Sequence, residues 1–402
     1  MSAPVEKSSR RLPSAVVWLG VVSLLTDASG EMIYPLLPLF LTSVLGAAPG
    51  FVGIVEGVAE TTASLLKLVS GWITDHLPRK KPLTVLGYGI SSTVRPLVAL
   101  ATAPWMVLAI RFTDRVGKGL RSTPRDAIVA EVTPADRRGA AYGYHRGMDN
   151  AGAVIGPLVG FALLGVGHFS LRAVFGLSAI PAGLAVAALV FGVREPAAHA
   201  APHKSIAAKQ KDPAASQYAW FDGRMRRYFL AVALFTLSNS SDAFLLLRAK
   251  TAGVTEAHIL LLWTLHNGVK ALLSRRFGAL SDRLGRRTLI LGGWTLYGLT
   301  YLGFGLANRT WQIWALFAIY GLYYALVEGT EKALVADLAP PEHRGRAFGI
   351  FNGVVGLLAL PASLLFSALY HPDHPIVAFA VAAGLAGAAS LLLLTVPLKR
   401  TN

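Results

Sequence analysis

The sequence predicts an all-α membrane protein with twelve transmembrane helices in two similar bundles of six. Of its 402 residues, 53% are hydrophobic and only 15% are charged, whereas soluble domains carry about 25% charged residues. Apolar runs of about 20 residues recur along the chain, the length that crosses a hydrocarbon core about 30 Å thick. Because a helix satisfies its own backbone polar groups inside lipid, each run is expected to be helical.

The expected spans divide evenly around a single linker. Residues 194–225 are rich in Ala, Pro, Lys and Gln and only weakly apolar, so we expect a bundle over 1–193, this linker, and a second bundle over 226–402. The spans before the linker are 15–41, 51–74, 82–103, 105–130, 139–166 and 171–193. Those after it are 226–247, 255–280, 288–307, 310–336, 345–369 and 375–398.

The distribution of basic residues predicts the orientation of the chain. Its formal charge of +16 is compatible with binding to nucleic acid, but the basic residues follow the positive-inside pattern instead. They gather before span 1, after spans 2, 4 and 8, in the linker and at the end of the chain. We therefore expect both termini to be cytoplasmic, no cleaved signal peptide and no nucleic-acid partner.

The two halves share motifs at matching positions. Gly71 to Asp75 runs into the basic cluster Arg79-Lys80-Lys81, and Gly278 to Asp282 runs into Arg286-Arg287. Likewise, the segment 131–139 aligns with 337–345. Two similar halves of six spans joined by a cytoplasmic linker indicate a parallel duplication, an arrangement common in secondary transporters.

These motifs resemble those of the major facilitator superfamily, over nearly the whole chain. The second loop motif is close to the signature of that family, whereas the first departs from it at His76 and Pro78. Further matches are Arg111 with Gly117 and Gly119, Tyr34-Pro35-Leu36-Leu37-Pro38, and Gly152, Gly156, Pro157 and Gly160, with Phe161 replacing a final glycine. The resemblance implies a twelve-helix alternating-access carrier similar to proton-coupled antiporters and exporters.

Span 4 is unusually charged for a membrane segment. At about 100° per residue, six charges fall on one helix face: Arg111, Asp114, Arg115, Lys118, Arg121 and Arg125. Because charges inside lipid are costly, we expect Arg111, Arg115 and Lys118 to face a cavity. Arg121 and Arg125 are expected to reach the cytoplasmic interface instead. With Arg146, the cavity-facing cations are the candidate binding groups for an anionic or zwitterionic substrate.

Acidic residues in the spans are the candidate proton carriers. Asp27 and Glu31 share one face of span 1, Glu56 and Glu60 share one face of span 2, and Asp149 lies in span 5. Such carboxylates can neutralise the cations or carry protons, and the sequence does not separate these roles. Tyr320 and Tyr324, one turn apart on span 10, are the aromatic residues best placed to contact a substrate, although most of the aromatics of the second half are expected to pack the core.

The repeated loop motifs are expected to act as a cytoplasmic latch. By resemblance, Asp75 faces the helix that begins near Gly345, and Asp282 faces the one near Gly139, where a carboxylate complements the helix dipole. Arg79 or Lys80 is expected to pair with Glu131, and Arg286 with Asp337. The small residues Gly152 and Gly156 permit a close helix contact, Pro157 removes one helix bond, and the resemblance favours a seal against leak there.

The interpretation is a monomeric carrier of a bacterial inner membrane that exports a small organic solute against inward proton flow. Alternatives are a carrier of a metal-chelating or phosphorylated metabolite, a lipid translocase, or a non-transporting receptor on the same scaffold. No cysteine is present, and no nucleophile–base constellation indicates an enzyme. The histidines 371 and 374 sit in a short loop, so we expect neither a metal site nor a cofactor.

Overall fold

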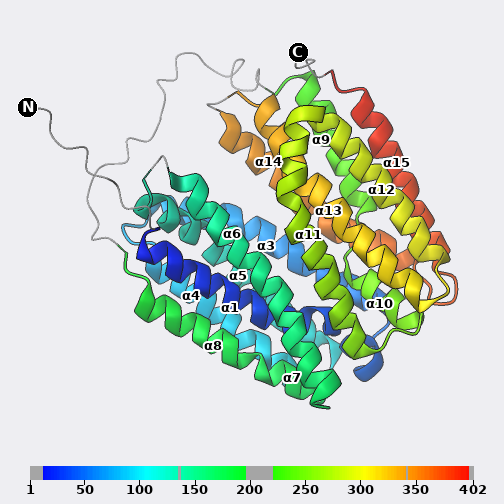
Figure 1. The fold of residues 1–402 in the computed structure, drawn as a ribbon, viewed down its shortest axis with the longest axis horizontal. Coiled ribbons are helices and arrows are strands. Elements are labelled where there is room, and N and C mark those ends of the chain that lie inside the picture. The colour runs from blue at the N-terminus through cyan, green and yellow to red at the C-terminus, as the bar shows by residue number, and fades with distance from the viewer. Residues whose placement is uncertain (1–11, 135–136, 196–220, 341–342, 398–402) are drawn as a thin grey trace, which may run out of the picture.

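The computed structural model describes residues 12–134, 137–195, 221–340 and 343–397, and within these ranges it contains helices and no strand. Figure 1 shows two groups of long helices, α1–α8 on one side and α9–α15 on the other. The helices correspond to the twelve predicted ranges, although five of those ranges are divided into more than one helical segment.

The helices of the first group correspond to spans 1–6. Span 1 comprises α1 (Ser14–Ile33), η1 (Tyr34–Leu36), α2 (Leu37–Leu39) and η2 (Phe40–Val44). Spans 2–5 comprise α3 (Pro49–His76), α4 (Lys81–Val94) with η3 (Arg95–Leu100), α5 (Pro104–Val132), and α6 (Arg138–Phe161) with η5 (Ala162–Val166). Span 6 comprises α7 (Leu171–Leu177), α8 (Ala179–Ala187) and η6 (Ala188–Gly192).

The helices of the second group correspond to spans 7–12. Span 7 is divided into α9 (Gly223–Ser238) and α10 (Ala243–Thr251), and the remaining spans are α11 (Glu256–Leu284), α12 (Arg286–Leu306), α13 (Thr310–Leu338), α14 (Arg344–Leu369) and α15 (Ile376–Leu394). The side chain of Asp222 caps α9 by accepting hydrogen bonds from the backbone N–H groups of Arg224 and Met225, which satisfies donors that a helix start leaves free.

Nine helical segments of the described chain are long and apolar enough to cross a membrane by length and composition. The three other long helices are α3, α5 and α11, which have 28, 29 and 29 residues. At about 1.5 Å per residue each is long enough to span a bilayer, but their charged residues lower their hydropathy. The three helices with too low a hydropathy to be recognised as spans are therefore among those whose charged side chains form the polar interior.

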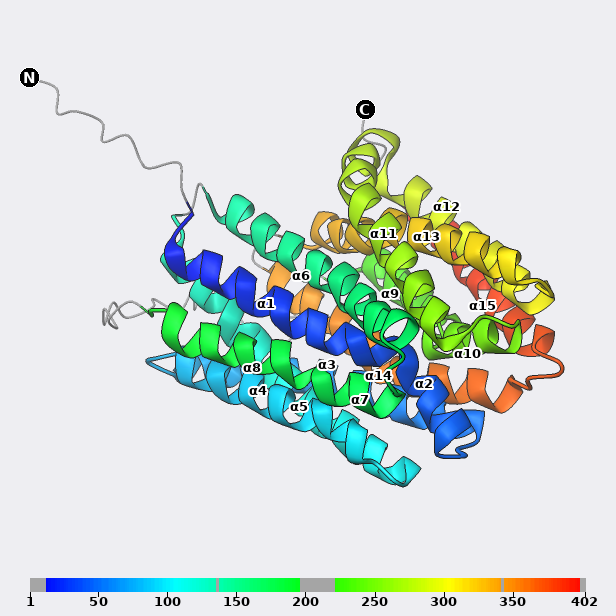
Figure 2. The same cartoon turned by 60° about the horizontal axis from the view of Figure 1, so that its bottom comes forward.

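The two helix groups approach each other at one end and diverge at the other (Figures 1 and 2). We call the divergent end, where α1 begins and α15 ends, the basic end, and the other the opposite end. Toward the opposite end α3 packs tightly on α14, since an added Cβ at Gly57 would lie 2.6 Å from Leu360. Thr61 also donates a hydrogen bond of 2.9 Å to the carbonyl of Gly356.

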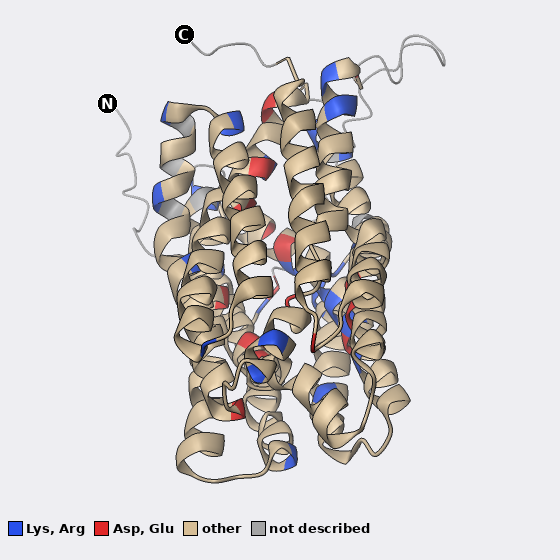
Figure 3. Ribbon diagram, turned by 90° about the vertical axis from the view of Figure 1, so that its right-hand side faces the viewer, with Lys and Arg blue, Asp and Glu red and all other residues tan. Residues whose placement is uncertain are grey.

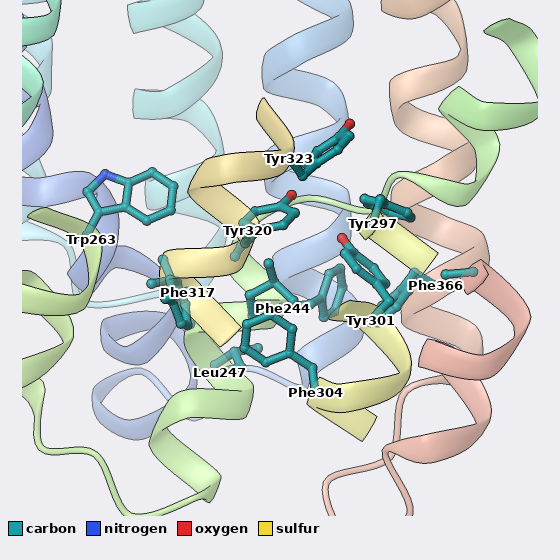
Figure 4. Close-up of a cluster of buried hydrophobic side chains, with 14 of the residues drawn as sticks. Phe244, Leu247, Trp263, Tyr297, Tyr301, Phe304, Phe317, Tyr320, Tyr323 and Phe366 are labelled. Atoms are coloured by element: carbon teal, nitrogen blue, oxygen red, sulfur yellow. The ribbon is translucent and has the colours of Figure 1, made fainter. Parts of the chain in front are cut away.

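An aromatic core stabilises the second helix group (Figure 4). Its largest buried side chains include Trp294, Tyr297, Tyr301, Phe304 and Phe317, each less than 2% exposed. Trp294 stacks on Phe235 with ring centroids 4.4 Å apart, and Tyr297 stacks on Tyr301 at 4.1 Å. Most of the aromatic residues of this half thus pack the core, as the sequence predicts.

The glycines of α6 allow close contact with α1. An added Cβ at Gly152 would lie 2.5 Å from the carbonyl oxygen of Leu24, and one at Gly156 would lie 2.5 Å from that of Ala28. Because both neighbours are backbone atoms, neither can move aside cheaply. This close contact therefore requires glycine at both positions, and it joins two helices of the same group.

Candidate functional site

A cavity of about 610 Å³ lies between the two helix groups. It is lined by residues of α1, η1, α3, η3, α5, α9, α11, α13, α14 and the segment that joins α9 to α10. Figure 3 shows acidic and basic residues gathered at this depth of the helices. Seven acidic residues line the cavity: Asp27, Glu31, Glu56, Glu60, Asp114, Asp242 and Glu328. Six basic residues join them: Arg95, Arg111, Arg115, Lys118, Arg121 and Lys270. The formal charges thus nearly cancel.

Ion pairs neutralise most of the basic face of α5. Arg111 donates from Nη2 to both carboxylate oxygens of Glu56 at 2.9 Å, and Arg115 lies 3.2 Å from Glu60. Asp114 pairs with Arg95 of η3 at 2.9 Å. Because α3 and η3 supply these partners, a cationic stripe that looks strongly anion-binding in the sequence is mostly compensated in the fold.

Two cations of α5 have no ion pair within 4.0 Å among the described residues, Lys118 and Arg121. The Arg121 guanidinium lies over the ring of Tyr88, 4.5 Å from its centroid, and only 5% of the residue is exposed. The expectation that Arg121 extends to the interface is therefore wrong. It turns inward because the Tyr88 ring offers an electron-rich face.

The carboxylates of α1 differ from those of α3 in their partners. Glu31 accepts a hydrogen bond of 2.6 Å from the indole Nε1 of Trp263, which belongs to α11 in the other helix group. Tyr34 packs on the same indole with ring centroids 5.4 Å apart. No hydrogen bond or ion pair within the described residues engages Asp27, which lies one turn away and feels the charges of Lys118 and Asp149. The contact with Trp263 thus places the Glu31 carboxylate where the two helix groups meet.

The second helix group contributes its own polar cluster to the cavity. Glu328 of α13 lies 2.8 Å from Lys270 of α11 and 3.5 Å from Lys332, and it also pairs with Arg146 of α6 across the two groups. Asp242 accepts a hydrogen bond of 2.6 Å from the Tyr320 hydroxyl. Nearby, Lys270 Nζ lies 4.8 Å from the centroid of the Tyr324 ring, which faces the cavity.

Three of the residues predicted to bind substrate or carry protons are not part of the cavity lining. Tyr320 is fully buried, and its hydroxyl donates a hydrogen bond to Asp242, which does line the cavity. Arg146 is half exposed and is held by Glu328. Asp149 accepts a hydrogen bond from Ser23 and lies 3.5 Å from His145. The other predicted substrate and proton residues do line the cavity.

The predicted latch is described only in part. The side chains of Asp75 and Asp282 and the surroundings of Gly139 and Gly345 are outside what the structure describes. Lys80, rather than Arg79, pairs with Glu131, and Arg286 lies 3.2 Å from Asp337. Each of these pairs stays within one helix group and is formed while the basic ends of the groups are apart. They therefore do not by themselves hold the groups together.

Some cavity residues were not anticipated as site residues. Arg95 is a charge inside span 3 directly before a proline. This pattern indicates a polar site, because arginines inside a membrane need partners. The Trp263–Glu31 bond has no such signal, because it joins side chains 232 positions apart. The description of the site therefore depends on the tertiary structure.

The fold and the cavity define a class of protein. A membrane-spanning helical protein with a polar cavity between two similar helix groups is built as a transporter rather than as an enzyme. Among the described residues, no group of three His, Asp or Glu side chains has the spacing to hold a metal ion.

Comparisons with known proteins establish the family. The Major Facilitator Superfamily model matches residues 19–266 and 238–402, so the chain belongs to this family and is an integral membrane transporter. It is 33% identical over 400 residues to an uncharacterized MFS-type transporter of Methanocaldococcus jannaschii, covering 96% of both chains. It is also 31% identical over 161 residues to the multidrug resistance protein MdtH of Proteus mirabilis, covering 38% of this chain and 40% of that protein.

Solved structures agree on the fold. A mutant of the peptide transporter POT in complex with alafosfalin aligns with a TM-score of 0.78 at 15% identity, covering 97% of this chain and 96% of that one. A mutant of the nucleoside transporter NupG aligns with a TM-score of 0.76 at 12% identity, covering 95% and 99%. At these identities the likeness concerns the fold alone.

Proposed function

We propose that this transporter is a proton-coupled exporter of a small zwitterionic organic solute. It acts as a monomer by alternating access in a bacterial inner membrane, with its basic end and both termini in the cytoplasm. The observation that carries the proposal is the cavity of about 610 Å³ between the helix groups, with seven acidic and six basic residues in its wall. A volume of this size suits a small solute.

The charge balance favours a solute with both signs. Because most of the α5 cations have carboxylate partners, a simple anion has few uncompensated positive groups to contact. Among the described residues, Lys118 has no ion pair on one wall and Asp242 has none on the other. A solute with separated positive and negative groups can complement both walls. A lipid translocase, by contrast, needs a long apolar path.

Proton coupling is assigned to the carboxylates of α1. The Glu31–Trp263 bond joins the helix groups, and a hydrogen bond to a carboxylate is roughly twice as strong as one to a neutral acid. Protonation of Glu31 therefore weakens a contact that holds the opposite end closed. Asp27, one helical turn away and with no ion pair among the described residues, is the second carrier. The similarity to MdtH, named a multidrug resistance protein, supports export as the direction.

The proposal is tested by proton movement in proteoliposomes. The purified protein is reconstituted with the pH dye pyranine inside, and amino acids, dipeptides and betaines are added outside, together with their N-acetyl and amide derivatives. Antiport of a zwitterion inward should make the interior more alkaline, and the singly charged derivatives should act more weakly. Glu31→Gln should abolish the pH change but keep solute exchange. Solute uptake without any pH change would contradict proton coupling.

A further inference from the structure

Span 7 is interrupted in the middle of the molecule, where α9 ends at Ser238 and α10 begins at Ala243. The four residues between them, Asn239 to Asp242, all line the cavity. A helix that stops inside a membrane leaves backbone groups without their usual partners, which is tolerated where they face protein or a water-filled cavity. The interruption therefore places polar backbone at the cavity wall.

The interruption presents several oxygen atoms that lack a partner. Among the described residues, the carbonyl oxygens of Asn239 and Ser240 accept no hydrogen bond. The side-chain oxygen Oδ1 of Asn239 is buried and also has no hydrogen-bond partner. A buried acceptor without a donor costs free energy, so this set is incomplete without a positively charged or hydrogen-bond-donating group.

A carboxylate completes the set. Asp242 accepts one hydrogen bond from Tyr320 Oη at 2.6 Å, which orients it and leaves its other oxygen available. The charged side chains that act most strongly on Asp242 are Lys270, Glu56 and Glu60. Lys270 lies 2.8 Å from Glu328, and the two glutamates pair with arginines of α5. Within the part of the chain that the structure describes, no cation therefore forms an ion pair with Asp242.

We propose that the interruption between α9 and α10 is a binding site for a singly charged cation, either the ammonium group of a transported solute or an alkali-metal ion. Carbonyl, amide and carboxylate oxygens are the ligands of hard cations, and interrupted helices place such carbonyls around coupling ions in other transporters. With a single carboxylate, the site suits one positive charge rather than two. The inference deepens the proposed function by naming the wall that takes the positive group, but its test does not require transport.

The test measures cation binding to the full-length protein in detergent. Sodium, potassium and methylammonium chloride are titrated at constant ionic strength against N-methylglucamine, with tryptophan fluorescence and thermal unfolding as readouts. We expect at least one of the three cations to stabilise the wild type. Asp242→Asn should weaken its apparent affinity at least about tenfold, Asp242→Glu should retain part of it, and the exposed Asp373→Asn should change nothing.

The outcomes separate the two sources of the cation and can overturn the proposal. Binding of an alkali ion that is lost in Asp242→Asn supports a resident ion, whereas selective binding of methylammonium supports a subsite for the solute. If no cation stabilises the wild type, or if Asp242→Asn binds equally well, the site does not exist. Proton movement without cation binding would leave the proposed function standing while the inference fails.

Discussion

Removing the indole N–H of Trp263 should shift the protein toward states that open at the opposite end. In Trp263→Phe the ring keeps its packing on Tyr34 and His266, but the 2.6 Å hydrogen bond to Glu31 is lost. A hydrogen bond to a charged group contributes about 1.5–3 kcal/mol. At about 1.4 kcal/mol per tenfold change, the equilibrium between the two access states should move by about 10- to 150-fold.

The absence of cysteine makes this shift measurable with spin labels. Gly143 on α6 and Gly278 on α11 lie near the basic end, and an added Cβ at either meets no atom within 4 Å, so both accept a labelled cysteine. We expect electron paramagnetic resonance distances between them to shorten in Trp263→Phe. The matched control is Trp294→Phe, because Trp294 donates an equivalent bond of 2.8 Å to Glu331 within one helix group. Identical distance distributions in the two variants would refute the reasoning.

Two further predictions concern packing and charge. Gly152→Ala should lower the free energy of unfolding by about 1–3 kcal/mol through overpacking against the backbone of α1. The control Gly147→Ala should not, because a Cβ added at Gly147 meets no atom within 4 Å. Thermal unfolding in detergent compares the two variants, and equal midpoints would count against the close α1–α6 contact. Glu56→Gln and Arg111→Gln should each cost about 3–5 kcal/mol by leaving a buried charge unpaired. The double variant should cost less than their sum, as measured by titration with sodium dodecyl sulfate, and strict additivity would show that the pair is not coupled.

The sequence predicts the fold well because lipid imposes a simple length and hydropathy rule. The positions of the spans and the family follow from that rule and from the repeated motifs. The interruption at 239–242 does not, although the run Asn239-Ser240-Ser241-Asp242 is polar enough to signal one. Asp27-Ala28-Ser29 in span 1 is similarly polar, yet α1 is continuous there while span 7 is divided.

For the site, the sequence predicts many of the residues that line the cavity but not how they pair with one another. The charged face of α5 does line the cavity, because charges at helical spacing inside a bilayer must face a polar interior. The net charge that this face presents to the cavity depends on ion-pair partners in other helices, which no local sequence pattern identifies. Arg95 adds a cation, and Glu56 and Glu60 neutralise two others. Of the anionic and zwitterionic substrates that the sequence allows, the balanced charges of the cavity favour the zwitterionic class.

The charged character of α3 and α5 also constrains how the chain is made. Each intramembrane charge costs about 2.5–3.5 kcal/mol when a helix enters lipid alone, and α3 carries Glu56 and Glu60 without an internal counter-charge at that depth. Their arginine partners lie in α5, which leaves the ribosome only after all of α4. We therefore expect that, during synthesis, α3 enters the lipid fully only after α5 has been made. Truncation of a nascent chain after α4 should leave α3 accessible to water-soluble reagents, while extension through α5 should protect it.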